Sequence, residues 1–418
     1  MTAVEPRASV SIVPELLRSA RACGAWGQGQ KSALFHDLDR FEARLDELRR
    51  AFPADTLHAV AIKANPLVEL AKVAVAAGAG LEAASWEEVA IARAAGCPPE
   101  RLIFDSPAKT DEELAGALAL GLWLNADSED ELRRLESLGA RREGPARIGL
   151  RVNPQLREGT IAMTATAGRG SKFGVPLADA PALLRRHGFV TGLHVHAGSQ
   201  GCDLALLQEA AAAAAAVAEA HDLEWLDVGG GIPVRYTEAD AEPFSFAAWA
   251  EALSTMPGWG RRRLVTELGR ALHAGCGWAL SRIEGVKEVD GVTTAVVHLG
   301  ADLLPRRAYR PEQWDHELWI LDPDGHPRDE LQRPCNVAGP LCFSGDFLAR
   351  ERMLAPPRRG DLLLIRDCGA YALGTWSRHC SRGLPPTWGY RGGGELRLLH
   401  RGETPEQVVS FWSLPPAP

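Results

Sequence analysis

The chain has 418 residues, 46% of them hydrophobic and 24% charged, the composition of an ordinary globular protein long enough for two domains. Its formal net charge of −8 argues against a nucleic-acid partner, because such a partner requires a basic surface. The sequence shows neither a secretion-signal pattern nor a stretch apolar enough to span a bilayer, so we expect no membrane partner.

The first predicted element lies within residues 32–52, where an expected strand runs into an amphipathic helix. From residue 56 onward, short apolar runs alternate with segments of helical period. The apolar runs predict eight strands, at residues 56–64, 79–85, 101–107, 122–128, 146–154, 191–199, 223–231 and 262–270. Seven helices are predicted between them, at residues 66–78, 86–96, 110–121, 128–139, 177–188, 204–221 and 245–256. Several of these helices follow Ser, Thr or Asp and end in Gly, as helix caps require.

This alternation predicts an α/β fold with parallel strands covered on both faces. Eight strand–helix units favour a closed (β/α)8 barrel of the TIM type, although an open, doubly wound sheet has the same order of elements. Polar or glycine-rich clusters follow nearly every strand, and the carboxyl ends of barrel strands converge on one active-site face. Strand ends are often polar in any fold, but eight such clusters favour the barrel.

After about residue 275 the chain changes to short β runs separated by Gly, Asp and Pro turns. We therefore expect three parts. Residues 1–40 contribute a strand to a β domain, residues 41–275 form the barrel, and residues 276–418 form a C-terminal, all-β domain.

Lys63 ends the first barrel strand, in the segment HAVAIKANP. Lysine is costly to bury, and a lysine at a strand end usually extends to solvent. A partly desolvated lysine can instead attack an aldehyde as a Schiff-base nucleophile. On position alone, the solvent-directed interpretation is slightly favoured.

The neighbouring strand ends supply groups suited to a phosphate. Gly229, Gly230 and Gly231 allow backbone N–H groups to crowd around an anion, although three glycines can also form an ordinary turn. Ser199 and Arg270 add a hydroxyl and a guanidinium, and Glu267 lies three residues before Arg270. A phosphate and an amine-reactive aldehyde together suggest pyridoxal phosphate.

The eight cysteines are scattered, with neither a C-x-x-C pair nor the spacing of a metal site. We therefore expect free thiols in a reducing, cytoplasmic compartment and no metal ion.

The chain resembles the fold type III pyridoxal-phosphate-dependent decarboxylases, the group of the diaminopimelate and ornithine decarboxylases. Seven motifs carry the resemblance in the family's order: AIKANP, SKFGV, HVHAGSQ, LDVGGGIP, TELGR, GPLCFSGD and DCGAYALG. Each motif is weak alone, and the seven in order are specific. The resemblance covers nearly the whole chain and implies an alanine-racemase-like barrel with a C-terminal β domain.

The resemblance implies a role for each matching residue. Lys63 carries the cofactor as a Schiff base, His196 stacks on the pyridine ring, and Glu267 pairs with the pyridine nitrogen. Taken alone, His196 would read as a core histidine. The phosphate is bound by Ser199, Gly229, Gly230, Gly231, Arg270 and Tyr371.

The resemblance also implies a shared active site. Cys342 is the acid near the substrate Cα, although an inert buried thiol is a fair alternative. Cys342 and Tyr371 reach into a partner's site, so the implied working unit is a head-to-tail homodimer.

Glu267 favours decarboxylation over racemisation. A carboxylate at this place keeps the pyridine nitrogen protonated, so that the ring absorbs the electrons released with CO2 and a quinonoid intermediate forms. In the racemases that share this fold, an arginine faces the pyridine nitrogen instead.

Four departures from the family pattern are visible, and three of them lie at the substrate end. Leu268 replaces a proline, a mild change. Phe343 replaces an acidic residue that would hold a distal ammonium group. In DLLPRRAY, Arg306 or Arg307 is the expected partner of a substrate carboxylate, with Tyr309 beside them. His379 and Cys380 replace family residues in SRHCSRG, which is equally well an ordinary surface loop.

From these departures we predict a decarboxylase of an α-amino acid other than diaminopimelate, lysine or ornithine. Phe343, Trp376 and Trp388 favour a less polar or larger substrate of specialised metabolism. An amino-acid racemase or epimerase with the same cofactor is the alternative enzyme, and a pyridoxal-phosphate carrier is the alternative without catalysis. A metal-dependent hydrolase lacks a matching ligand pattern.

Overall fold

The structure is a computed structural model and describes residues 10–27, 29–238, 240, 242–392 and 394–414. The chain divides into two compact units. One, here called the barrel unit, consists of Glu42–Arg235 and Ala241–Leu272. The other, here called the β unit, consists of Met1–Phe41, Tyr236–Asp240 and His273–Pro418.

The barrel unit contains a closed ring of parallel strands. Its members are β2 (Leu57–Ala61), β3 (Gly80–Ala83), β4 (Leu102–Phe104), β5 (Trp123–Ala126), β6 (Arg147–Asn153), β8 (Val190–His194), β9 (Trp225–Asp227) and β10 (Arg263–Leu268). Pairing of β5 with β6 and of β10 with β2 closes the ring. The predicted (β/α)8 barrel is therefore confirmed, and the open sheet is excluded. The short strand β7 (Val175–Pro176) pairs with the end of β6.

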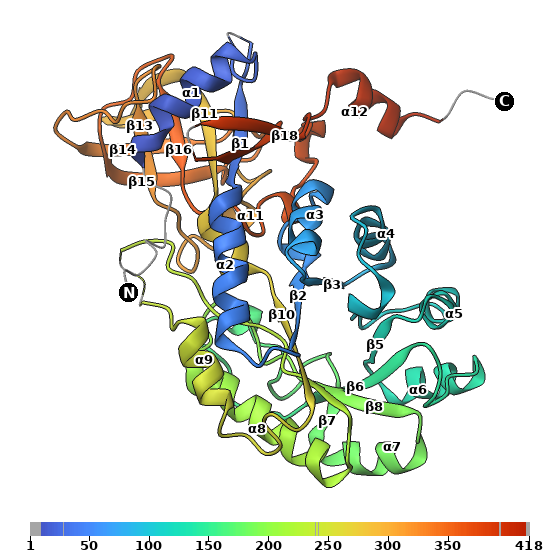
Figure 1. Cartoon of the computed structure of the whole chain (residues 1–418). Helices are drawn as coiled ribbons and strands as arrows, with labels where there is room; N and C mark the ends of the chain where they lie inside the picture. The colour runs from blue at the N-terminus through green and yellow to red at the C-terminus, as the bar shows by residue number, and fades with distance from the viewer. Residues whose placement is uncertain (1–9, 28, 239, 241, 393, 415–418) are drawn as a thin grey trace. The chain divides into compact units, whose positions relative to one another are not determined.

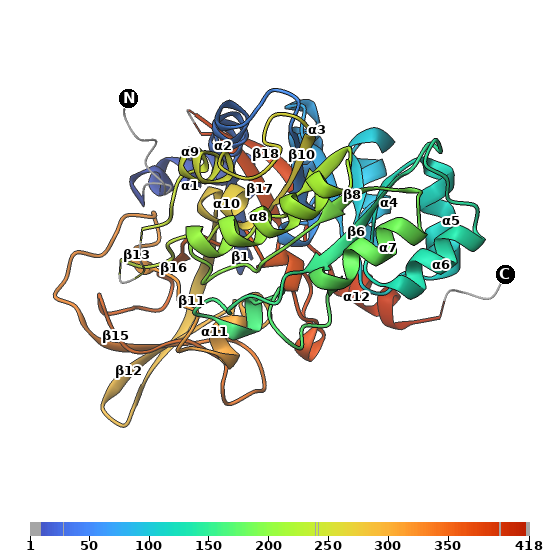
Figure 2. The same cartoon turned by 90° about the horizontal axis from the view of Figure 1, so that it is seen from below.

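The barrel helices follow one another around the outside of the strands (Figures 1 and 2). They are α3 (Val68–Ala76), α4 (Trp86–Ala94), α5 (Asp111–Leu120), α6 (Glu129–Ser137), α7 (Ala180–Arg186), α8 (Leu204–Ala220) and α9 (Phe246–Leu253). The expected caps are present in α5: Thr110 forms a capping box with Glu113, and Gly121 ends the helix with a left-handed φ of 74°. Helix α2 (Leu38–Ala51) leads into β2.

Two tryptophans fill one layer of the barrel interior. Trp123 and Trp225 meet edge to face with ring centroids 4.9 Å apart, within a buried apolar cluster. Gly149 and Gly192 lie against Trp225, and a Cβ atom at either position would come within 2.3 Å or 2.1 Å of its ring. The bulky ring thus requires glycine on two neighbouring strands, and it closes this part of the barrel to ligands.

The β unit is a sheet to which the N-terminal strand contributes. Strand β1 (Ser32–Asp37) pairs antiparallel with β11 (Gly277–Val289) and parallel with β17 (Thr387–Arg391), so the expected N-terminal contribution to the β domain is confirmed. The remaining strands are β12 (Val292–Val297), β13 (Leu318–Leu321), β14 (Arg333–Ala338), β15 (Phe347–Leu354), β16 (Leu362–Ile365) and β18 (Glu395–His400). The helices are α1 (Val13–Ala22), α11 (Pro305–Tyr309) and α12 (Pro405–Trp412), and α10 (Arg270–His273) follows the last barrel strand.

Two strands and one helix of the β unit were missed by the sequence analysis. Strands β15 and β18 bury few of their residues and carry charged side chains, so they lack an apolar run. Helix α1 was also missed, although Leu16 and Leu17 are fully buried in a cluster with Phe35 and Trp278.

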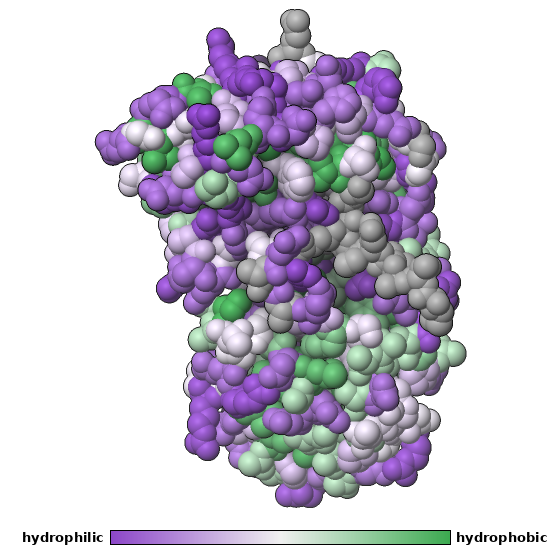
Figure 3. Space-filling model, turned by 90° about the vertical axis from the view of Figure 1, so that its left-hand side faces the viewer, coloured by the Kyte–Doolittle hydropathy of each residue, from purple (hydrophilic) through white to green (hydrophobic). Residues whose placement is uncertain are grey.

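No helix in the described part of the chain is long and apolar enough to cross a membrane. The face drawn in Figure 3 is largely hydrophilic, with apolar patches scattered over it. All eight cysteines lie among the described residues, and none of these eight is paired in a disulfide.

Candidate active site

A layer of polar side chains lies next to the tryptophan layer inside the barrel. Side chains two residues apart on a strand share a face, and on most of the strands a residue of the apolar layer is followed by a polar one on the same side. Four such steps are Trp123 to Asn125, Gly149 to Arg151, Gly192 to His194 and Val265 to Glu267. The polar members are buried: Glu82, Asp105, Asn125, Arg151, His194, Asp227 and Glu267.

Lys63 stands at the edge of this layer, in the short 3-10 helix Ile62–Ala64 that follows β2. Its Nζ donates to Glu82 Oε2, within ion-pair distance. The Lys63 side chain is 36% exposed, whereas that of Glu82 is fully buried. Lys63 is therefore not a solvent-directed lysine: it turns to a buried carboxyl group and keeps an accessible side.

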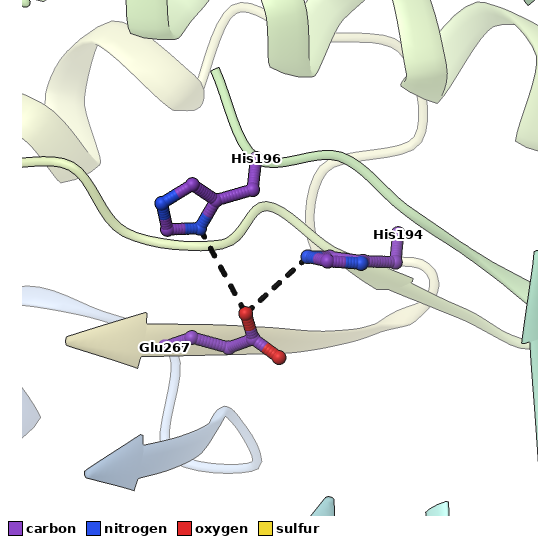
Figure 4. Close-up of side chains that lie close together, drawn as sticks. All are labelled: His194, His196 and Glu267. Carbon is purple, nitrogen blue, oxygen red and sulfur yellow. Dashed lines mark ion pairs between the residues drawn. The ribbon is translucent and has the colours of Figure 1, made fainter. Parts of the chain in front are cut away.

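Glu267 lies at the centre of the layer, between two histidines. Its Oε2 is 3.3 Å from His194 Nε2 and 3.8 Å from His196 Nδ1 (Figure 4). Burial favours the protonated acid, but His194 and Lys63 outweigh it and hold the pKa of Glu267 well below its usual range. Glu267 is thus an anion in a dry site.

The other buried carboxyl groups divide into two kinds. Burial raises the pKa of Glu82 to about 8 and that of Asp227 well above its usual value. Burial acts on Asp105 in the same direction, but Arg151, whose Nη1 lies 3.1 Å from Asp105 Oδ2, outweighs it and lowers the pKa. At neutral pH, Glu267 and Asp105 are therefore ionised, Glu82 is mostly protonated, and burial favours the protonated form of Asp227.

Of the residues predicted to bind a phosphate, those of the barrel unit come together at one place, whereas Tyr371 belongs to the β unit. Arg270 donates to Ser199 Oγ from Nε at 3.4 Å and from Nη2 at 3.3 Å. A Cβ on Gly230 would lie 2.1 Å from the backbone oxygen of Glu267, and Gly231 has a left-handed φ of 100°. Only glycine permits this close, turned backbone, in which the N–H groups of Gly229 and Gly230 donate to Asp227 Oδ1 and His196 Nδ1.

The predicted residues of the β unit are gathered around helix α11. Arg306 stacks on the rings of Tyr371 and Trp314, at 4.7 Å and 4.9 Å from their centroids. Arg307 Nε lies 3.1 Å from Asp315 Oδ1. Cys342, predicted as either an acid or an inert buried thiol, is exposed. These residues all belong to the β unit.

Phe343 stacks on Tyr309 in the same part of the β unit, with ring centroids 5.2 Å apart. The ring centroid of His379 lies 6.3 Å from that of Phe343, and Tyr309 is 59% exposed. Nearby Asp346, the last residue of the CFSGD motif, accepts the backbone N–H groups of Ala301 and Leu341. The motif thus ends in a residue that fixes the loop.

Six residues of the polar layer received no role in the sequence analysis: Glu82, Asp105, Asn125, Arg151, His194 and Asp227. All but Asp227 lie in a strand-end cluster that was recognised from the sequence. Counting two residues onward from the apolar layer would have found Asp105, Arg151, His194 and Asp227. Their register on neighbouring strands is the information that the sequence lacks.

Two groups of residues in the described chain also have the spacing of metal ligands: His194, His196 and Glu267, and Glu82, Asp105 and Glu267. Both contain Glu267 and belong to the layer just described. The predicted absence of a metal stays a prediction.

Comparison with known proteins agrees with this geometry. Residues 38–274 match the family model of the pyridoxal-dependent decarboxylases, pyridoxal binding domain. Diaminopimelate decarboxylase of Deinococcus radiodurans is 35% identical over 383 residues, covering 89% of this chain and 93% of the relative. The enzyme of that name from Neisseria meningitidis serogroup A is 32% identical, covering 91% and 92%. The crystal structure of diaminopimelate decarboxylase from Helicobacter pylori complexed with L-lysine has a TM-score of 0.83 and 25% identity, covering 92% and 97%.

These relatives contradict the prediction that the substrate is not a diamino acid. They carry the name diaminopimelate decarboxylase, at 30–35% identity over most of the chain. That prediction relied on the aromatic residues Phe343, Trp376 and Trp388. In the structure, the Phe343 ring lies beside the rings of Tyr309 and His379.

Proposed function

The chain belongs to the pyridoxal-dependent decarboxylase family, and from this premise we propose that it removes one carboxyl group of diaminopimelate as CO2. The enzyme is a pyridoxal-phosphate-dependent carboxy-lyase. The observation that supports the substrate is the similarity to diaminopimelate decarboxylases over about nine tenths of the chain. The product would be lysine, because diaminopimelate minus one CO2 is lysine.

The barrel unit fits the cofactor at three points. Both carboxylate oxygens of Glu267 are buried without a hydrogen-bond partner, which suits a donor such as a protonated pyridine nitrogen. Ser199, Arg270 and the turn at Gly229–Gly231 suit a phosphate. Lys63 supplies the amine. These points support the proposed barrel of residues 41–275 as the cofactor-binding part.

Pyridoxal phosphate, when bound, supplies an aldehyde that condenses with amines and a ring that accepts the electrons of the breaking C–C bond. The chain's residues provide the rest. Lys63 would hold the cofactor through its amine. Glu82, with a pKa raised to about 8 by burial, can give a proton to Lys63 Nζ or take one from it.

Glu267 holds a proton at the pyridine nitrogen by remaining an anion beside it. His196 Nδ1 accepts the backbone N–H of Gly230 at 3.3 Å, which fixes the orientation of its ring. Burial lowers the pKa of His196 to about 3, so the ring is neutral and suited to stacking on the cofactor.

We assign the far end of the substrate to residues around α11. Arg306 or Arg307 would bind a carboxylate, and Tyr309, Phe343 and His379 would line the adjoining space. As implied by the family, Cys342 and Tyr371 would act in the site of a second copy, in a head-to-tail homodimer. The cytoplasmic location stays a prediction.

The first test is an absorbance spectrum of the purified protein combined with CO2 release from diaminopimelate, lysine and ornithine. A cofactor band that is lost in Lys63→Ala, with CO2 from diaminopimelate, is the expected result. If CO2 is released from lysine or ornithine and not from diaminopimelate, that amino acid is the substrate instead. If chiral analysis finds the inverted amino acid and no CO2 is released, the enzyme is a racemase instead.

The homodimer has its own test, because Lys63→Ala and Cys342→Ala affect different copies of a shared site. Each variant should be inactive alone. After the two are mixed under conditions that exchange subunits, some dimers contain one site with both residues intact, and activity should return. If the activity stays absent although the subunits exchange, both residues serve the same chain's site.

A further inference from the structure

Two histidines lie near the same oxygen of Glu267, and their surroundings give them different roles (Figure 4). His196 Nδ1 accepts the N–H of Gly230, so this nitrogen carries no proton. Since the pKa of His196 is lowered to about 3 by burial, the ring is neutral at working pH. His196 therefore cannot be the positive charge that keeps Glu267 ionised.

His194 lies between two carboxylates. Its Nε2 is 3.3 Å from Glu267 Oε2, and its Nδ1 is 3.7 Å from Asp105 Oδ1. The side chains of His194 and Glu267 are fully buried, and Asp105 is nearly so. An imidazole with an acidic oxygen at each nitrogen is favoured as the doubly protonated cation.

Arg151 extends this row to a fourth member. Its Nη1 lies 3.1 Å from Asp105 Oδ2, and its Nε lies 3.8 Å from Asp127 Oδ1. Burial would lower the pKa of His194, but Asp105 and Glu267 outweigh it and raise the pKa to about 9. The row Arg151, Asp105, His194, Glu267 thus alternates in charge across four strands of the barrel.

We propose that His194, as an imidazolium, is a positioning residue that keeps Glu267 ionised where it faces the pyridine nitrogen of the cofactor. The inference rests on the proposed role of Glu267. Nothing in the reaction requires His194 to touch substrate or cofactor: it acts through Glu267.

The remaining titratable groups of the layer do not replace His194. Glu82 and Asp227 are acids and supply no positive charge, His196 is neutral, and Arg151 is engaged by Asp105. Lys63 also lowers the pKa of Glu267, but it contributes less than His194 and is the residue that condenses with the cofactor. Once Lys63 has reacted, His194 remains the cation that is closest to the carboxylate.

The physical consequence concerns one proton shared between Glu267 and the pyridine nitrogen. A positive charge beside the carboxylate favours the ion pair, with the proton on nitrogen. Without it, a buried pair favours its neutral form, with the proton on Glu267, because separated charges are costly in a dry site. The ring would then be a weaker electron acceptor.

The experiment uses the full-length holoenzyme reconstituted with pyridoxal phosphate labelled with 15N in the ring. The NMR shift of that nitrogen reports its protonation directly and needs no substrate. In the wild type at neutral pH, the nitrogen should be protonated. In His194→Gln, its signal should move towards the unprotonated value, and kcat should fall about tenfold or more while KM changes little.

His187→Gln is the matched control. His187 is equally buried, but it precedes β8, at the opposite end of the strand from the site. Its replacement should leave the 15N signal in place. If the signal in His194→Gln also stays at the protonated value, the inference is overturned.

A second measurement keeps the inference testable if His194→Gln does not fold or bind cofactor. In wild-type holoenzyme with labelled histidine, His194 should remain an imidazolium at neutral pH, and in Asp105→Asn it should lose its proton at lower pH. A neutral His194 in the wild type would overturn the inference. CO2 release that fails on diaminopimelate would affect only the substrate assignment, whereas absence of any cofactor band would remove the assigned role of Glu267 and this inference with it.

Discussion

At the scale of single residues, position in the polar layer decides charge more than residue type does. Glu82, Asp105, Asp227 and Glu267 are all buried carboxyl groups, yet their pKa values move in opposite directions. The difference lies in the neighbours: Asp105 has Arg151, and Glu267 has His194. Burial alone would have left all four protonated.

Glu267→Gln should lower kcat by about a hundredfold or more, because an amide cannot act as the anionic partner of a protonated nitrogen. KM should change little, since Glu267 is predicted to face the cofactor. Steady-state kinetics on diaminopimelate checks this. Glu251→Gln, an exposed change on α9, is the control. Wild-type kcat in Glu267→Gln would contradict the assigned role.

The two candidate arginines of α11 should behave differently. Arg307 is paired with Asp315, and Arg306 lies over the ring of Tyr371, which is itself predicted to serve the site. Arg306→Gln should therefore raise KM for diaminopimelate about tenfold, the usual value of a charge-assisted hydrogen bond. Arg307→Gln should leave KM within about twofold. The reverse result would move the carboxylate site to Arg307.

At the scale of elements, the barrel strands are arranged around one large side chain. Trp225 of β9 lies over glycines of β6 and β8, and its Nε1 donates to Thr191 Oγ1 at 3.0 Å. This layer supports the polar layer two residues further along each strand. A change in it should therefore affect both stability and the site.

Gly192→Ala should destabilise the barrel by about 1–3 kcal/mol, because the new Cβ would lie 2.1 Å from the Trp225 ring. Gly188→Ala is the matched control, since a Cβ there would meet nothing within 4 Å. Its free energy of unfolding should stay within about 0.5 kcal/mol of the wild type. Urea denaturation measures both. Equal stability of the two variants would show that the layer can rearrange.

At the scale of the whole molecule, buried groups set the dependence of stability on pH. His194 has its pKa raised from 6.5 to about 9, and Glu82 from 4.5 to about 8. Between pH 6.5 and 8, both His194 and Glu82 hold more protons in the folded, cofactor-free chain than in the unfolded chain. Between pH 8 and 9, this remains true of His194. The buried histidines with lowered pKa values, such as His36 and His58, act below pH 6.5.

The cofactor-free protein should therefore lose stability as the pH rises from 6.5 to 9, by roughly 1.4 kcal/mol per pH unit for each such group. The contribution of His194 is fully present below pH 6.5 and is lost as the pH passes about 9. Urea denaturation at several pH values measures the slope. His194→Gln should flatten it, and an unchanged slope would contradict the raised pKa.

Much of the architecture was predictable, because its signals are local. The eight barrel strands and their helices follow from apolar runs and caps, and Lys63, Glu267, Ser199 and Arg270 were named from motifs. The edge strands β15 and β18 were missed because they bury few side chains. The substrate prediction, drawn from Phe343, Trp376 and Trp388, was wrong, because relatives that share about nine tenths of the chain carry the name diaminopimelate decarboxylase.

The sequence by itself determined the barrel, the family and the cofactor, since periodicity and ordered motifs are properties of the chain alone. Only the tertiary structure decided which strand ends face one another across the barrel. That arrangement places His194 between Asp105 and Glu267, which lie 89 and 73 residues away along the chain. Charge states in a dry site depend on distances of a few ångströms, and the sequence contains no such distances.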